Sequence, residues 1–157
     1  MSAEYRLGVG IVVLNAEKKV FVAQRIDNPS AAWQMPQGGL DAGEEPLDGV
    51  LRELEEETSI APTSVSIIAE SDGWLSYDFP DDLRAKLWGG RFSGQKQKWY
   101  LARFTGDEAE INLETEHPEF SAWQWIDFDQ TVEMIVAFKR PLYELIYQEF
   151  AEIVAQQ

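Results

Sequence analysis

Three glutamates in the middle of the chain, Glu53, Glu56 and Glu57, are the side chains best placed to do chemistry. The apolar spacing around them predicts a helix that begins near Pro46. At 100° per residue, the three carboxylates fall within an arc of about 100°, whereas Glu55 points to another side. Such an arc is typical of a solvated surface. It also suits a divalent-cation site, because hard cations take several oxygen ligands and remove the repulsion between carboxylates.

The segments around this helix predict a sheet that would hold it. Two β-rich runs, residues 7–15 and 19–26, indicate a hairpin, and further strands are expected at residues 65–71, 73–79, 96–105 and 121–127. A terminal helix is expected over residues 141–154. The expected core faces of the two helices are Leu47, Val50, Leu51 and Leu54, and then Leu142, Leu145, Ile146, Phe150, Ile153 and Val154. This order predicts an α/β fold, with a mixed sheet between helices, in a single domain over residues 1–157.

The residues that flank the glutamates make the pattern specific. Their order and spacing resemble the Nudix box, the signature of a family of phosphoanhydride hydrolases. The matching residues are Gly38, Glu44, Arg52, Glu53, Glu56, Glu57 and Ile60. One position departs from the pattern, because this chain has Ser59 where family members usually have Gly. A left-handed residue is expected there, at a cost of about 1 kcal/mol for Ser.

The resemblance extends from about Tyr5 to Phe150. The segments "GVGIVVLN", "WQMPQGG", "GQKQKW", "PEF", "WQW" and "FKRPLY" are similar to those of bacterial RNA pyrophosphohydrolases and of the related dinucleoside polyphosphate hydrolases. The resemblance implies a Nudix-type α/β/α sandwich. It also implies that Glu44 and Arg52 pair to brace the loop against the helix.

The same resemblance implies a metal-dependent hydrolase. Mg²⁺, with Mn²⁺ as the alternative, would be held by Glu53, Glu56 and Glu57, by the backbone carbonyl of Gly38 and by Glu119. These three helix glutamates are the candidate catalytic residues, with Glu53 as the candidate general base, although metal-bound hydroxide could serve without it. The lone histidine, His117, is expected to be a loop residue.

The substrate residues are carried over in the same way. Arg25 and Phe138 match positions that sandwich a base, although Phe138 could equally be core packing. Tyr77 and Lys139 are weaker candidates for the same pocket.

The "GQKQKW" segment offers a second set of substrate contacts. Alternation along a strand places Gln95 and Gln97 on one face and Lys96 and Lys98 on the other. The lysines suit phosphate oxygens, and which face meets substrate stays open.

Charge separates the functional hypotheses only in part. The net charge of −15 argues against general nucleic-acid affinity, yet residues 84–103 hold six of the 13 basic residues and no acid. The first hypothesis is removal of pyrophosphate from 5′-triphosphorylated RNA, and its close rival is hydrolysis of dinucleoside polyphosphates. A non-catalytic cation- or nucleotide-binding module is the third, which the complete box disfavours.

The remaining composition bounds the setting. The chain has no cysteine, which excludes disulfides and thiolate zinc sites and permits a cytoplasmic location. No run reaches the ~18 apolar residues that a membrane span requires, and the first residues lack the features of a signal peptide. The sequence does not give the oligomeric state.

Overall fold

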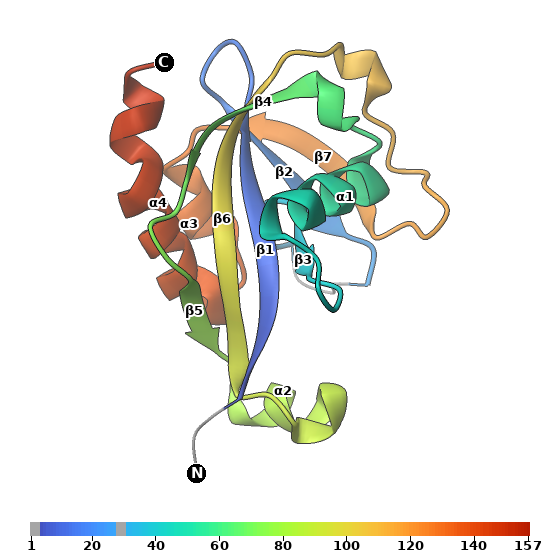
Figure 1. Cartoon of the computed structure of the whole chain (residues 1–157), viewed down its shortest axis with the longest axis vertical. Coiled ribbons are helices and arrows are strands. Elements are labelled where there is room, and N and C mark those ends of the chain that lie inside the picture. The colour runs from blue at the N-terminus through green and yellow to red at the C-terminus, as the bar shows by residue number, and fades with distance from the viewer. Residues whose placement is uncertain (1–3, 28–30) are drawn as a thin grey trace.

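A mixed β-sheet with helices on both faces forms the molecule, as the computed structural model shows for residues 4–27 and 31–157 (Figure 1). Its strands are β1 (Tyr5–Leu14), β2 (Val20–Arg25), β3 (Gln37–Gly39), β4 (Val65–Glu70), β5 (Leu75–Asp78), β6 (Gly94–Phe104) and β7 (Phe120–Ile126). The main order is β4-β6-β1-β2-β7, with β3 on β1 and β5 on β6. The predicted α/β/α sandwich with a mixed sheet is therefore confirmed.

The parallel pair β1–β6 runs through the centre of this sheet. Its register extends from Tyr5 opposite Gly94 to Leu14 opposite Arg103, and the other strand pairs are antiparallel. The predicted hairpin corresponds to β1 and β2. The long register matters for function because it brings the start of the chain beside a strand that lies about ninety residues later in the sequence.

Helices α1 (Pro46–Thr58) and α4 (Arg140–Ala155) cover opposite faces of the sheet (Figure 1). Successive residues of β1 alternate between the two cores. Val9, Ile11 and Val13 pack in the cluster that contains Val50 and Leu54 of α1. Val12 and Leu14 pack in the cluster of α4, which is formed by Leu142, Tyr143, Ile146, Phe150 and Val154. Both long helices therefore lie where their apolar spacing predicted.

The prediction of burial is wrong for two of the expected core residues. Leu47 is 40% exposed in the first turn of α1, and Leu145 is 42% exposed on α4. Tyr143 is buried on α4 instead, and its hydroxyl accepts a hydrogen bond from the backbone N–H of Met35 at 2.9 Å. An aromatic side chain with a polar tip thus belongs to the buried face of α4, and Leu145 does not.

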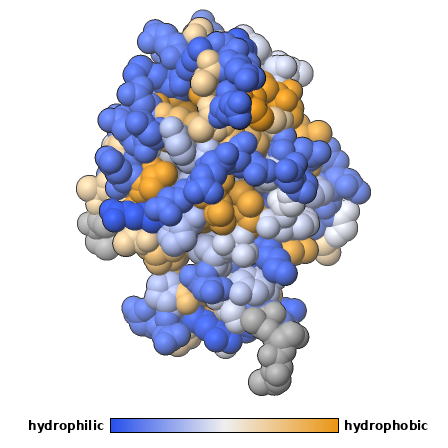
Figure 2. Space-filling model, turned by 90° about the vertical axis from the view of Figure 1, so that its left-hand side faces the viewer, coloured by the Kyte–Doolittle hydropathy of each residue, from blue (hydrophilic) through white to orange (hydrophobic). Residues whose placement is uncertain are grey.

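The short helices α2 (Asp81–Lys86) and α3 (Gln130–Met134) were not expected from the sequence. Single 3₁₀ turns occur at Pro62–Ser64, Trp88–Gly90, Glu108–Glu110 and Ala137–Lys139. On the face shown in Figure 2, apolar surface appears as separate areas between hydrophilic ones. In the described part of the chain, no helix is long and apolar enough to cross a membrane.

Candidate active site

A cavity of about 660 Å³ opens where the ends of several strands meet α1. Its walls come from distant parts of the sequence, which only the sheet topology brings together. The polar and charged lining residues include Arg6, Arg25, Asp27, Gln34, Gln37, Glu53, Glu57, Gln95, Glu119 and Lys139, and the apolar and aromatic ones include Tyr77, Phe79, Leu83, Leu87, Val136 and Phe138. The same cavity therefore has several carboxylates on one part of its lining and aromatic and apolar side chains on another.

Gly38 allows the first carboxylate to approach the backbone. A Cβ atom at this position would overlap the side chain of Glu53, so only glycine leaves room for the carboxylate. Gly38 is held in β3, where it pairs with Val9 of β1. The sheet thereby fixes the backbone of Gly38 directly against Glu53, and the two proposed oxygen donors are neighbours.

Glu57 is the most unusual carboxylate of the site. It is only 3% exposed, and its Oε2 atom has no hydrogen-bond partner in the part of the chain that the structure describes. Burial raises the pKa of Glu57 well above its ordinary value, and the nearby charges of Glu119 and Glu53 raise it further. A buried carboxyl oxygen without a partner is costly, so its place here calls for a ligand.

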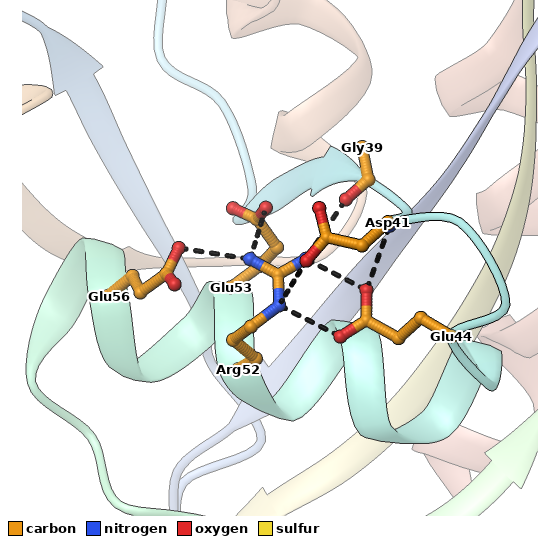
Figure 3. Close-up of polar contacts among 6 residues, drawn as sticks. All are labelled: Gly39, Asp41, Glu44, Arg52, Glu53 and Glu56. Carbon is orange, nitrogen blue, oxygen red and sulfur yellow. Dashed lines mark hydrogen bonds and ion pairs between the residues drawn. The ribbon is translucent and has the colours of Figure 1, made fainter.

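Glu53 and Glu56 are instead held by Arg52 (Figure 3). The Nη1 atom of Arg52 lies 3.0 Å from Glu53 Oε1 and 3.1 Å from Glu56 Oε2. Burial raises the pKa of Glu53, and the positive charge of Arg52 opposes that rise. The guanidinium thus occupies the space between two of the three box carboxylates.

The other side of the same guanidinium binds Glu44. Arg52 Nε lies 2.8 Å from Glu44 Oε2, and Arg52 Nη2 lies 2.9 Å from Glu44 Oε1 (Figure 3). Glu44 also accepts the backbone N–H of Asp41 at 3.0 Å. The hydrogen bonds from Arg52, together with that N–H, lower the pKa of Glu44 to about 2. The predicted Glu44–Arg52 pair is confirmed, and it ties the loop before α1 to the helix.

The chemistry of these donors fits hard divalent cations. Every candidate ligand is a carboxylate or carbonyl oxygen, and Glu57 offers a buried oxygen with no other partner among the described residues. Within residues 4–27 and 31–157, no three acidic, histidine or cysteine side chains are arranged to hold an ion as they stand. Arg52 binds one oxygen of Glu53 and one of Glu56, so each carboxylate keeps a second oxygen that Arg52 does not use.

Glu56 lies outside the first cavity and lines a second one of about 590 Å³. This second cavity also contains Glu57, Glu119 and the exposed His117. Glu57 and Glu119 line both cavities, so they form the wall between them. The predicted metal ligands are therefore gathered around one wall rather than in a single pocket.

The four residues expected to hold the base all line the first cavity. The Arg25 guanidinium is bound by Asp27, at 2.9 Å from Nε and 3.1 Å from Nη2. The rings of Tyr77 and Phe138 lie 6.2 Å apart, and Lys139 Nζ is 5.7 Å from the centre of the Tyr77 ring. Burial lowers the pKa of Lys139 to about 8. The two weaker candidates, Tyr77 and Lys139, thus share the cavity with the two stronger ones.

The open question about β6 has a clear structural answer. Gln95 lines the cavity, whereas Lys96 and Lys98 lie on the opposite face of the strand and outside its lining. Lys96 Nζ sits 5.2 Å from the centre of the Tyr5 ring, and Lys98 Nζ is 4.0 Å from Glu70. The cavity gives no support to a substrate role for these lysines, which stays a prediction.

Sequence reasoning missed Arg6 and Gln37 in the lining. Arg6 pairs with Gln95 across the parallel β1–β6 register, a contact between distant residues that no local pattern encodes. A signal for Arg6 existed, because a charged residue opens an otherwise apolar strand in "YRLGVG". Gln37 stands beside Gly38 in the segment that carries the box glycine.

Comparison with known proteins gives one family. The model described as "NUDIX domain" matches residues 4–146. An RNA pyrophosphohydrolase of Rhodospirillum rubrum is 55% identical over 153 residues, which cover 98% of this chain and 91% of that protein. An RNA pyrophosphohydrolase of Zymomonas mobilis is 54% identical over 148 residues, which cover 94% of this chain and 96% of that protein.

Solved structures agree on the fold. An Ap4A hydrolase of C. elegans in a binary complex has a TM-score of 0.69 at 20% identity, with 97% of this chain and 99% of that chain covered. The E. coli dihydroneopterin triphosphate pyrophosphohydrolase has a TM-score of 0.68 at 20% identity, with 90% and 96% covered.

Proposed function

The chain belongs to the NUDIX domain family, and from that premise we propose that it removes pyrophosphate from the 5′ end of triphosphorylated RNA. Relatives about half identical over nearly the whole chain, named RNA pyrophosphohydrolases, are the observation that carries the proposal. Nudix hydrolases act on phosphoanhydride bonds and generally use divalent cations. Mg²⁺ is the proposed cation, with Mn²⁺ as its substitute.

The proposed metal ligands are Glu53, Glu56, Glu57, Glu119 and the carbonyl of Gly38. Ions held by these residues would neutralise charge on the bridging phosphates and lower the pKa of the attacking water. Glu53 takes the proton of the attacking water on its carboxylate, for which a pKa raised by burial is favourable. Glu57 needs the ions most, because its buried Oε2 has no partner among the described residues.

The proposed substrate path runs from these carboxylates to the aromatic wall. A phosphate chain bound near Glu53 and Glu57 leads its nucleoside toward Arg25, Phe138 and Tyr77 in the same cavity. The base stacks on Phe138 while Arg25 and Lys139 supply positive charge. A nucleotide with several phosphates is the class of molecule that matches both the carboxylates, through bound ions, and the aromatic wall.

Dinucleoside polyphosphates are the rival substrates. The net charge of −15 and the position of Lys96 and Lys98 outside the cavity favour a small substrate over a long RNA. A non-catalytic module is disfavoured, because none of the box glutamates is replaced. Residues 1–157 acting as one domain, and a cytoplasmic location, stay predictions.

Side-by-side kinetics distinguish the substrates. Purified protein with Mg²⁺ is given 5′-triphosphorylated RNA and diadenosine tetraphosphate, and kcat/KM is compared. We expect the larger value for RNA. Phe138→Ala should raise KM for both substrates by the equivalent of about 1–3 kcal/mol, the usual value of base–aromatic stacking. A larger kcat/KM for diadenosine tetraphosphate would put the rival first.

The salt dependence tests an extended RNA track. If Lys96 and Lys98 contact RNA phosphates, changing both to Gln should weaken RNA cleavage and flatten its salt dependence, because fewer counterions are released. The dinucleotide reaction should have a shallower salt slope from the start. Equal slopes for the two substrates would remove the case for such a track.

A further inference from the structure

Three side chains of β6 lie on the face of the strand from which Gln95 lines the cavity. Because side chains alternate along a strand, Gln95, Gln97 and Trp99 share one face. The β1 residues opposite Gln97 and Trp99 are Gly8 and Gly10. A Cβ atom at Gly10 would overlap the Trp99 ring, whereas one at Gly8 would first meet the carbonyl oxygen of Gly38 at 2.7 Å and would lie 3.4 Å from the side-chain oxygen of Gln95. Gly10 therefore leaves the space that the Trp99 ring occupies.

Trp99 fixes the orientation of one amide. Its ring is fully buried, and Nε1 lies 2.9 Å from Gln97 Oε1. An indole N–H can only donate, so the atom that faces it must be an acceptor. Gln97 is also fully buried, so its amide must turn its oxygen to Trp99 and its nitrogen to the other side.

That nitrogen fixes two further amides. Gln97 Nε2 lies 2.5 Å from Gln37 Oε1 and 2.8 Å from Gln95 Oε1. An NH₂ group can only donate, so both partners must present their oxygens to it. Rotation of either amide by half a turn would place two donors against each other in a buried site.

The nitrogens of Gln37 and Gln95 are consequently directed away from Gln97. Both residues line the cavity. Among the hydrogen bonds of the described residues, none uses the Nε2 atom of either one. Arg6 adjoins Gln95 across the β1–β6 register and lines the same cavity, so a cationic side chain lies on the strand next to one of the two NH₂ groups.

From this chain of contacts we propose that Trp99 and Gln97 are positioning residues that make Gln37 and Gln95 present N–H donors, not carbonyl oxygens, to the substrate phosphates. The inference rests on the proposed function, because it takes the polyphosphate chain of the substrate as the acceptor of these N–H groups. Phosphate oxygens only accept, so a flipped glutamine would repel the chain where a correctly set one binds it. A buried indole thus sets which polar atoms the cavity wall offers.

Two variants disturb the orientation in different ways. Trp99→Phe keeps an aromatic ring in the core and removes the N–H that anchors Gln97, together with part of the buried indole ring. Gln97→Glu keeps the shape and still accepts from Trp99, but it cannot donate, so Gln37 and Gln95 should turn their nitrogens inward. Tyr100→Phe is the matched control, since it changes the next residue of β6 on the opposite face.

The measurement is the dissociation constant for inorganic tripolyphosphate with Mg²⁺, by calorimetry, beside KM and kcat for triphosphorylated RNA. We expect Trp99→Phe to raise the dissociation constant and KM about tenfold, the equivalent of one hydrogen bond to a charged group, while kcat changes much less. Gln97→Glu should have a larger effect, and Tyr100→Phe should match the wild type. Thermal unfolding verifies that each variant folds.

A double-mutant cycle separates orientation from charge, because Gln97→Glu also adds a negative charge. With Gln37 and Gln95 both changed to Met, Gln97→Glu should weaken tripolyphosphate binding no further. An unchanged penalty in that background would overturn the inference, as would folded Trp99→Phe with wild-type affinity and KM. Wild-type protein that binds tripolyphosphate but does not cleave RNA would instead overturn the proposed function alone.

Discussion

The carboxylates near the two ends of α1 lie in opposite environments. At the N-terminal end, Glu44 is bound by Arg52 and by the Asp41 N–H, and its pKa falls to about 2. At the C-terminal end, Glu57 is buried without a partner for Oε2 among the described residues, and its pKa is raised well above the ordinary value. The paired carboxylate stabilises the fold, whereas the unpaired one is retained at a cost in stability.

Arg52 divides its hydrogen bonds between these two ends. Nε and Nη2 serve Glu44, while Nη1 serves Glu53 and Glu56 (Figure 3). The guanidinium reaches every carboxylate drawn there but not the buried Glu57. Arg52 therefore compensates the negative charge of Glu44, Glu53 and Glu56. Glu57 lies beyond its reach, at the position where we propose an ion.

Removal of the unpaired charge should have the largest effect. Glu57→Gln keeps the shape of the side chain but loses a charged metal ligand, so kcat with Mg²⁺ should fall by at least ~10²-fold, since ligand contacts of this kind contribute several kcal/mol. In metal-free buffer the variant should unfold at the same or a higher temperature, because a neutral amide replaces a carboxyl group whose ionised form is disfavoured by burial. Steady-state kinetics and calorimetric melting measure the two effects.

Metal-linked stability sharpens the same comparison. Mg²⁺ at 100 times its dissociation constant should stabilise the wild type by about 2.7 kcal/mol and stabilise Glu57→Gln much less. Asp48→Asn, an exposed position in the first turn of α1, is the matched control and should behave as the wild type. Full activity of Glu57→Gln at saturating Mg²⁺ would show that the uncompensated carboxylate is not part of the site.

The paired end should respond through stability. Glu44→Gln removes the negative charge and one of the two oxygens that accept from Arg52, and should lower the free energy of unfolding by about 1.5–3 kcal/mol at neutral pH, the usual value for hydrogen bonds to charged groups. The folded pKa of about 2 lies below the ordinary 4.5, so the pair stabilises the fold fully above pH 4.5. This contribution is lost as the pH falls from 4.5 toward 2, and the variant and wild type should converge there.

Urea unfolding at neutral and acid pH measures this convergence. Glu53→Gln supplies the contrast, because it should lower kcat by at least ~10²-fold as a lost general base, which Glu44→Gln should not do. If Glu44→Gln abolished kcat at an unchanged melting temperature, the bracing role of the pair would be wrong.

Much of this comparison could be predicted from the sequence, because it depends on local spacing. The 3.6-residue period predicted α1 and the arc of its carboxylates, and the resemblance to the Nudix box implied the Glu44–Arg52 pair. The prediction for Leu47 was wrong, because periodicity gives the side of the helix on which a residue lies but not whether its turn is covered, and Leu47 is 40% exposed. Residue type alone also could not show that Glu57 Oε2 lacks a hydrogen-bond partner among the described residues while Glu53 binds Arg52.

The cavity wall was less accessible to prediction. Both faces of "GQKQKW" are polar, so alternation could not decide which one lines the cavity. The neighbours of Gln95 in the fold are Arg6 and Tyr77, which meet it only through strand register. The short helix α2 was missed because six residues are too few for a helical period to stand out.

The smallest expected effect tests whether strain at the C-terminal end of α1 is compensated locally. Ser59 adopts the left-handed conformation with φ of 67°, which costs a non-glycine residue about 1 kcal/mol. Its hydroxyl donates to the carbonyl of Asn112 at 2.8 Å, and one such bond contributes about 1 kcal/mol in return. Ser59→Gly relieves the strain but loses the bond, so its free energy of unfolding should stay within about 0.5 kcal/mol of the wild type. Ser59→Ala keeps the strain and loses the bond, so it should be less stable by about 1 kcal/mol. If urea unfolding found Ser59→Gly more stable than the wild type by more than 1 kcal/mol, the hydroxyl would not offset the strain. Ser59 would then be a second residue, beside Glu57, that lowers stability at this end of the helix.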